Sequence, residues 1–212
     1  MAHLATPARR TLYNDPTFSD IKIRQIYKGK VKEYAAHKAV LCAHSGWFMA
    51  ALTGRFKEAS ADTIEVHDDD PETFQNMMEF FYGLDLERTP TSDNENEIIR
   101  DDIVPIVELH ALADKYDANL LQKAAVVAFK AGTDELVSLP DWKSFEMLVN
   151  AHYLTCPGTM GAMSQAIVKY MYRISRSYFL WDGYFDKLAA KHGNFGADSY
   201  LVGRAGGKIV FN

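Results

Sequence analysis

Apolar and charged residues alternate early in the chain, in the pattern of a β-hairpin. Residues 19–24 (Ser-Asp-Ile-Lys-Ile-Arg) have the two-residue period of a half-buried strand. Lys28-Gly29-Lys30 suits a tight turn, and residues 31–36 are then predicted to return as the second strand. The polar residues 1–16 show no periodicity and are predicted to form a flexible arm.

Two short helices and a third strand are predicted to follow the hairpin. Residues 38–43 have helical composition. Ser45 can cap a second helix over residues 46–52, which Gly54 ends. The run Thr-Ile-Glu-Val at residues 63–66 predicts a short strand.

The strongest helix start in the sequence is Asp70-Pro71-Glu72. The Asp70 carboxylate can accept hydrogen bonds from free backbone N–H groups, and Pro71 suits the first helical position. The negative charge of Glu72 favours the positive end of the helix dipole. Apolar residues then recur at positions i, i+3, i+4 and i+7 and predict one buried face: Phe74, Met77, Met78 and Phe81.

The second half of the chain is predicted to be helical after an acidic loop. Residues 84–102 are rich in Thr, Ser, Asn and acidic residues and are predicted to form a solvated insertion. An all-helical extension is predicted over residues 132–193, and the Gly-rich residues 194–212 have no pattern that assigns them a structure. Helices are predicted over residues 103–113 and 119–131, from a cap at Asp141, over 163–174, and from a cap at Asp182.

Composition narrows the classes of partner. With 212 residues, 48% of them hydrophobic, the chain can bury the core of one domain with a helical annex. The net charge of −5 argues against nucleic acid, because phosphate binding requires clustered positive charge. There is no run of about 18 apolar residues and no apolar stretch of a secretory signal. We therefore expect no membrane span and an intracellular location, cytoplasmic or nuclear.

The cysteines and histidines do not predict a metal site or a cofactor. Cys42 and Cys156 are far apart in the sequence, and reduced thiols are expected for them. His37 is predicted to be a hydrogen-bonded core residue, and the other dispersed histidines are interpreted as structural or surface residues: His44, His67, His110, His152 and His192. The sequence has no nucleophile elbow, paired catalytic carboxylates or nucleotide loop, so no enzymatic activity is expected.

Several segments resemble the BTB/POZ family and follow one another in the family's order. They include Ser19-Asp20-Ile21, the run Tyr-Ala-Ala-His-Lys-Ala-Val-Leu at 34–41, and residues 45–52, 68–74 and 109–116. The resemblance covers residues 17–131 and implies an α+β fold, in which a cluster of helices covers a small sheet. The all-helical extension is similar to that of short fungal BTB proteins.

The resemblance implies a homodimer, because BTB domains often dimerise through the first strand and the first two helices. The residues at these positions are Ile21, Ile23, Val40, Leu41, Trp47, Phe48 and Met49. A small sheet with two short helices can leave an apolar patch that a twofold partner covers. The alternative is that these side chains fill the core of a single chain. This alternative is favoured for Val40 and Leu41 and is left open for Trp47 and Met49.

Two more pairs of residues are assigned a role by the resemblance. Asp20 and Lys38 lie where the family has a charged pair near its groove, although they could also be two exposed charges that never meet. Phe56 and Glu58 lie just after the second helix, where family members that recruit cullin-3 contact this scaffold. Phe56 would fill a cleft and Glu58 would add a polar contact. The alternative is an exposed loop with Phe56 packed inward.

Three non-catalytic functions follow as hypotheses. The first is an adaptor or scaffold that associates with itself or with other proteins. The second is a substrate adaptor of a cullin-3 ubiquitin ligase. The third is a transcriptional co-regulator that binds peptides in the groove of a dimer.

Overall fold

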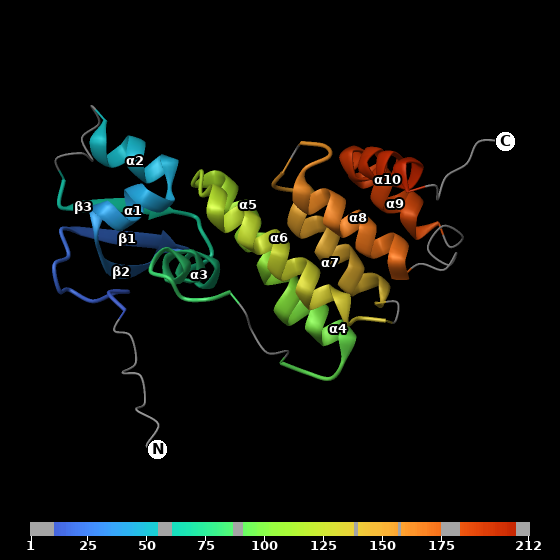
Figure 1. The fold of residues 1–212 in the computed structure, drawn as a ribbon, viewed down its shortest axis with the longest axis horizontal. Coiled ribbons are helices and arrows are strands. Elements are labelled where there is room, and N and C mark those ends of the chain that lie inside the picture. Colours follow the sequence, from blue (N-terminus) through green and yellow to red (C-terminus); the bar gives the residue numbers. More distant parts are fainter. Residues whose placement is uncertain are drawn as a thin grey trace, which may run out of the picture. The chain divides into compact units, whose positions relative to one another are not determined.

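The chain forms two compact units. The computed structural model describes residues 11–54, 61–86, 91–137, 140–156, 158–174 and 183–206. The first unit contains the described residues up to Asp85 together with Tyr116–Ala118, and the second contains the rest. Figure 1 shows the strands in the first unit and a bundle of helices in the second. The predicted α+β class is confirmed.

The first unit is built on a three-stranded sheet with the order β2-β1-β3. β1 (Ile21–Tyr27) pairs antiparallel with β2 (Lys30–Ala36) and parallel with β3 (Thr63–His67). Lys28 and Gly29 connect the hairpin with φ angles of 47° and 77°, which suit a two-residue hairpin turn. The predicted alternation is confirmed, since one face of β1 is buried: Ile21, Ile23 and Gln25.

Short helices complete the first unit, and the last two of them begin at a residue whose side chain caps the helix. They are α1 (Lys38–His44), α2 (Gly46–Thr53) and α3 (Pro71–Phe81). At the start of α2, the Ser45 hydroxyl accepts a hydrogen bond from the N–H of Phe48, at 3.0 Å. At the start of α3, the Asp70 carboxylate accepts hydrogen bonds from the N–H groups of Glu72 and Thr73. The predicted apolar face of α3 is buried: Phe74, Met77, Met78 and Phe81.

The segment Tyr116–Ala118 belongs to the first unit because it binds the start of α2. The Ser45 hydroxyl donates to the carbonyl oxygen of Tyr116 at 2.6 Å, and the Gly46 N–H donates to that of Asp117 at 3.1 Å. A Cβ atom on Gly46 would lie 1.9 Å from a carboxylate oxygen of Asp117, so a larger residue here would displace the Asp117 side chain. The Tyr116 hydroxyl donates to Asp69 at 2.6 Å. These contacts fix the position of α2.

The described residues of the second unit are largely helical. Its elements are α4 (Glu95–Glu97), the π-helix η2 (Ile98–Ile103), α5 (Val104–Lys115), α6 (Asn119–Asp134), α7 (Trp142–Tyr153), α8 (Ala162–Ile174), α9 (Tyr184–Lys191) and α10 (Gly193–Ala205). α5 packs against α6 and α7, and α6 packs against α8. Their inward faces share one apolar core, which includes Ile103, Val107, Phe129, Phe145, Leu148, Ile167, Met171 and Phe195.

Two segments are helical where the sequence predicts none. Residues 95–102, within the loop predicted over 84–102, form α4 and most of η2, which ends at Ile103. Asn94 caps this segment, and Ile98 and Ile99 are buried in the core of the second unit. α10 forms in the tail that had no assignment. The predicted cap Asp182 lies outside the described residues.

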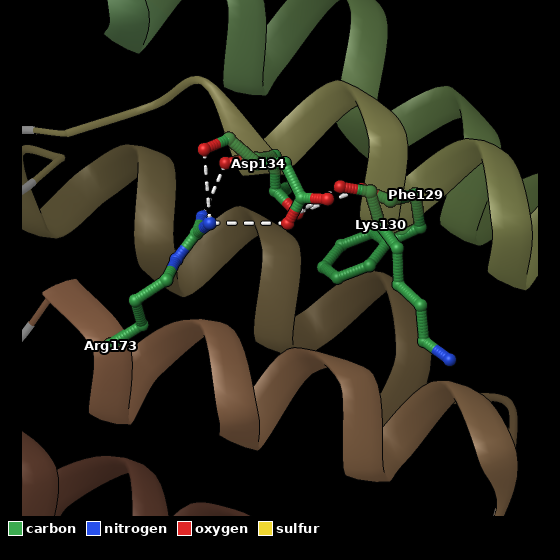
Figure 2. Close-up of polar contacts among 5 residues, drawn as sticks. Phe129, Lys130, Asp134 and Arg173 are labelled. Atoms are coloured by element: carbon green, nitrogen blue, oxygen red, sulfur yellow. Dashed lines mark hydrogen bonds and ion pairs between the residues drawn. The ribbon is translucent and has the colours of Figure 1, made fainter.

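An arginine from α8 binds the C-terminal end of α6, as Figure 2 shows. The Arg173 guanidinium donates to the backbone carbonyl of Asp134 at 3.0 Å and to its carboxylate at 3.2 Å. It also donates to the carbonyl oxygen of Thr133. The hydroxyl of Thr133 donates back to Phe129 at 2.8 Å within α6. A positive charge at this end complements the helix dipole, so Arg173 links α6 to α8.

Candidate interaction surface and a histidine–cysteine cavity

The seven residues predicted to form a dimer interface differ in exposure. Four of them are buried within the first unit: Ile21, Ile23, Leu41 and Phe48. Val40 is partly exposed. Trp47 and Met49 expose 38% and 45% of their surface. A partner can therefore reach Val40, Trp47 and Met49 without rearrangement of the core.

Trp47 is held in place although part of it is exposed. Its backbone N–H donates to the carbonyl oxygen of Tyr116 at 3.4 Å. Its ring meets those of Phe48 and Tyr116 edge to face, with centroids 4.9 and 5.2 Å away. A fixed aromatic side chain loses little conformational entropy on binding. We define Trp47 and Met49 as the α2 surface.

Asp20 and Lys38 meet through a backbone hydrogen bond. The Asp20 carboxylate accepts a bond from the N–H of Lys38, the first residue of α1, at 2.7 Å. His37, at the cap position of α1, offers no side-chain cap of its own, so Asp20 supplies one from 18 residues away. No ion pair joins the two side chains in the part of the chain that the structure describes. Their predicted role in a charged pocket stays a prediction.

The predicted cullin-3 contact residues, Phe56 and Glu58, lie outside the described residues. α2 ends at Thr53, and the description of the chain resumes at residue 61. The contact proposed for these two residues therefore stays a prediction from the sequence.

Two histidines and a cysteine converge in the second unit. His110 lies on α5, His152 lies in the last turn of α7, and Cys156 follows one turn later. One nitrogen of each imidazole and the Cys156 Sγ all lie within 4.8 Å of one another. The N–H of Cys156 donates to the carbonyl oxygen of His152 at 2.9 Å, which continues the helical turn and brings both side chains to one face. These residues and Asp114 line a cavity of about 620 Å³.

Burial disfavours the charged forms of all three groups in this cluster. Burial, and to a smaller extent the neighbouring His110, lower the pKa of His152 to about 4, against the opposing effects of Asp198 and Asp114. Burial also lowers the pKa of His110, against the opposing effect of Asp114. It raises the pKa of the Cys156 thiol. The Nδ1 atoms of both histidines are buried and have no hydrogen-bond partner.

This cluster was not predicted from the sequence. The spacing His152-x-x-x-Cys156 is a signal that could have been recognised, because residues four apart lie on one face of a helix. His110 belongs to a different helix, and only the packing of α5 against α7 brings it to the other two. No sequence pattern predicts that step.

The comparison with known proteins agrees with the sheet and helices of the first unit. A model of the BTB/POZ domain matches residues 11–131, more than half of the chain. The chain belongs to the BTB/POZ domain family. The match includes every residue of the α2 surface and His110, but it ends before His152 and Cys156. The cluster therefore extends beyond the matched part of this BTB/POZ chain.

Relatives of the BTB/POZ chain are similar to only part of it. It is 37% identical over 71 residues to TD and POZ domain-containing protein 4 of Mus musculus. The aligned segment covers 34% of this chain and 18% of that protein. It is 33% identical over 63 residues to Kelch-like ECH-associated protein 1A of Danio rerio. That alignment covers 30% of this chain and 10% of the relative. The chain spans about a tenth to a fifth of the length of these curated relatives. Among the described residues, none of the helices has the length and apolar character needed to cross a membrane.

Proposed function

We propose that this BTB/POZ chain is a non-catalytic adaptor that associates with itself and with other proteins inside the cell. The observation that carries the proposal is the exposure of Trp47 and Met49 on α2, where the family resemblance expects a dimer interface. Covering these two side chains would remove apolar surface from water, which favours association. Cys42 and Cys156 are free thiols, which is compatible with a reducing compartment.

The proposed homodimer is tested by Met49→Arg. A partner that covers the α2 surface would have to bury the new charge, so we expect the dissociation constant of the dimer to rise at least about tenfold, or about 1.4 kcal/mol. Sedimentation velocity over a range of protein concentrations measures this constant. Met49 is 45% exposed, so the substitution leaves the core of the monomer intact.

Val31→Arg is the matched control for this experiment. Val31 is 49% exposed in the same unit, at the start of β2 and outside the predicted interface. The control should leave the dissociation constant near that of the unmodified chain. A chain that is strictly monomeric at high micromolar concentration would rule out the proposed homodimer.

We further propose that the chain is a substrate adaptor of a cullin-3 ubiquitin ligase. The support is the position of Phe56 and Glu58 just after α2, which matches the segment that family members use for this contact. The similarity to a Kelch-like ECH-associated protein adds support for an adaptor role. The helical second unit would then be the part that binds the substrate.

Calorimetric titration of the chain into the N-terminal domain of cullin-3 tests this second proposal. We expect binding with a dissociation constant of about 1 μM or tighter, weakened by about tenfold in Glu58→Lys. Glu33→Lys makes the same charge reversal at an exposed position on β2, 47% exposed at the side chain, and should bind normally. If the unmodified chain does not bind, or if both variants weaken binding equally, the proposed contact is wrong.

A further inference from the structure

The histidine–cysteine cavity of the second unit has the composition of a metal site. Imidazole nitrogen and thiolate sulfur are the ligands that Zn²⁺ prefers, and three protein ligands leave a fourth position open. His110, His152 and Cys156 supply this set from two helices and the turn after one of them. We propose that these three residues bind one zinc ion, with the fourth position facing the cavity.

The geometry allows this site with small side-chain movements. Zinc bonds to nitrogen and sulfur are about 2.0–2.3 Å long, so the ligand atoms of a tetrahedral site lie about 3.5 Å apart. All three ligand atoms here already lie within 4.8 Å of one another. Closure therefore requires the side chains to move by about 1 Å, which leaves the packing of α5 against α7 unchanged.

Two buried nitrogen atoms without partners are the second observation. His152 is only 3% exposed, and its Nδ1 has no hydrogen-bond partner, as is also true of His110 Nδ1. A buried polar atom without a hydrogen-bond partner is destabilising. Coordination of a metal ion would satisfy such an atom.

The charges around the cluster favour a cation. Zinc binding would break the S–H bond of Cys156 and release one proton to solvent, so the sulfur would bind as a thiolate. The carboxylate of Asp114 lines the same cavity and accepts a hydrogen bond from Gln122 at 2.7 Å. The thiolate and Asp114 together balance the two positive charges of the ion. Asp114 lies outside the group within 4.8 Å, so we assign it this electrostatic role.

Zinc titration of the chelator-treated full chain, in competition with a chromophoric chelator, tests the site. We expect one equivalent of zinc to bind with a dissociation constant of about 1 μM or tighter. We also expect binding to release one proton, which calorimetry measures by comparing buffers of different ionisation enthalpy. Cys156→Ser should weaken binding at least about 100-fold. Co²⁺ in place of zinc should give a thiolate charge-transfer band in the unmodified chain and none in Cys156→Ser.

Cys42→Ser is the matched control. Cys42 is also a partly buried free thiol with a raised pKa, but it belongs to no group of metal-ligating residues among those that the structure describes. It should bind zinc like the unmodified chain, and so should Met49→Arg, since the α2 surface lies in the other unit. The site is overturned if Cys156→Ser binds zinc as tightly as the unmodified chain. It is also overturned if Co²⁺ bound to the unmodified chain gives no thiolate band.

Discussion

His37 connects three parts of the first unit through its backbone and both ring nitrogens. Nε2 lies 2.8 Å from the carbonyl oxygen of Thr17, and because a carbonyl can only accept, this nitrogen donates. In the neutral ring Nδ1 then accepts from the Tyr82 hydroxyl at 2.9 Å. That hydroxyl oxygen accepts in turn from the His37 N–H at 3.0 Å. The predicted hydrogen-bonded core histidine is confirmed, with partners 20 and 45 residues away that no local pattern identifies.

Tyr82→Phe should destabilise the first unit. The substitution removes the hydroxyl and leaves the N–H and Nδ1 of His37 without a partner, which costs about 1–3 kcal/mol of the free energy of unfolding. Urea unfolding followed by circular dichroism measures this loss.

Tyr27→Phe is the control, because it removes a hydroxyl in the same way. The ring of Tyr27 contacts the ammonium group of Lys28, which lies 4.8 Å from the ring centroid. Phenylalanine keeps that contact, so this variant should unfold within about 0.5 kcal/mol of the unmodified chain. Equal stability of the two variants would show that the Tyr82 hydroxyl is not a structural link.

At the scale of single elements, the sequence predicts those helices whose start is encoded locally. Asp70 and Pro71 identify the first residue of α3 correctly. Asp141 caps α7 as expected, and its carboxylate accepts a hydrogen bond from the N–H of Ser144 at 2.7 Å. These signals work because a cap satisfies backbone groups within three residues of itself. The hairpin is predictable for the same reason, since its period and its turn are both local.

Helices that depend on packing are not predictable in this way. α10 contains Gly193, Gly196 and Gly203, and each glycine disfavours a helix by about 1 kcal/mol relative to alanine. The helix forms because Phe195 and Val202 are buried in the core of the second unit. Gly196 also allows a close approach to α9, since a Cβ there would lie 3.3 Å from the Cβ of Ala189.

The candidate sites show the same division. Trp47 and Phe48 are adjacent aromatic residues on a short helix, and the sequence cannot decide which one is buried. Phe48 stacks on Tyr116 with centroids 5.5 Å apart and is fully covered, whereas Trp47 meets Tyr116 edge-on and keeps an exposed side. That outcome depends on a segment far away in the sequence, as does the approach of His110 to Cys156.

At the scale of the whole molecule, the family match and the compact units have different boundaries. The match ends at residue 131, inside α6, and the boundary predicted between residues 131 and 132 falls in the same helix. α5 and most of α6 lie within the matched range, yet they share one core with α7, α8 and α10. The second unit therefore combines the end of the BTB/POZ match with the extension (Figure 1).

A chain cut after Val137 should fail to fold its remaining helices stably. Ile103, Val107 and Phe129 are fully buried against side chains that the cut removes, such as Phe145 and Ile167. Their exposure would create a large apolar surface, which favours aggregation. We expect loss of cooperative thermal unfolding and strong binding of a hydrophobic dye. A chain cut after Gly206 keeps every core residue that the structure describes and is the control. If the shorter chain instead unfolds cooperatively at the temperature of the control, residues up to 137 fold on their own, and the extension is a separate domain.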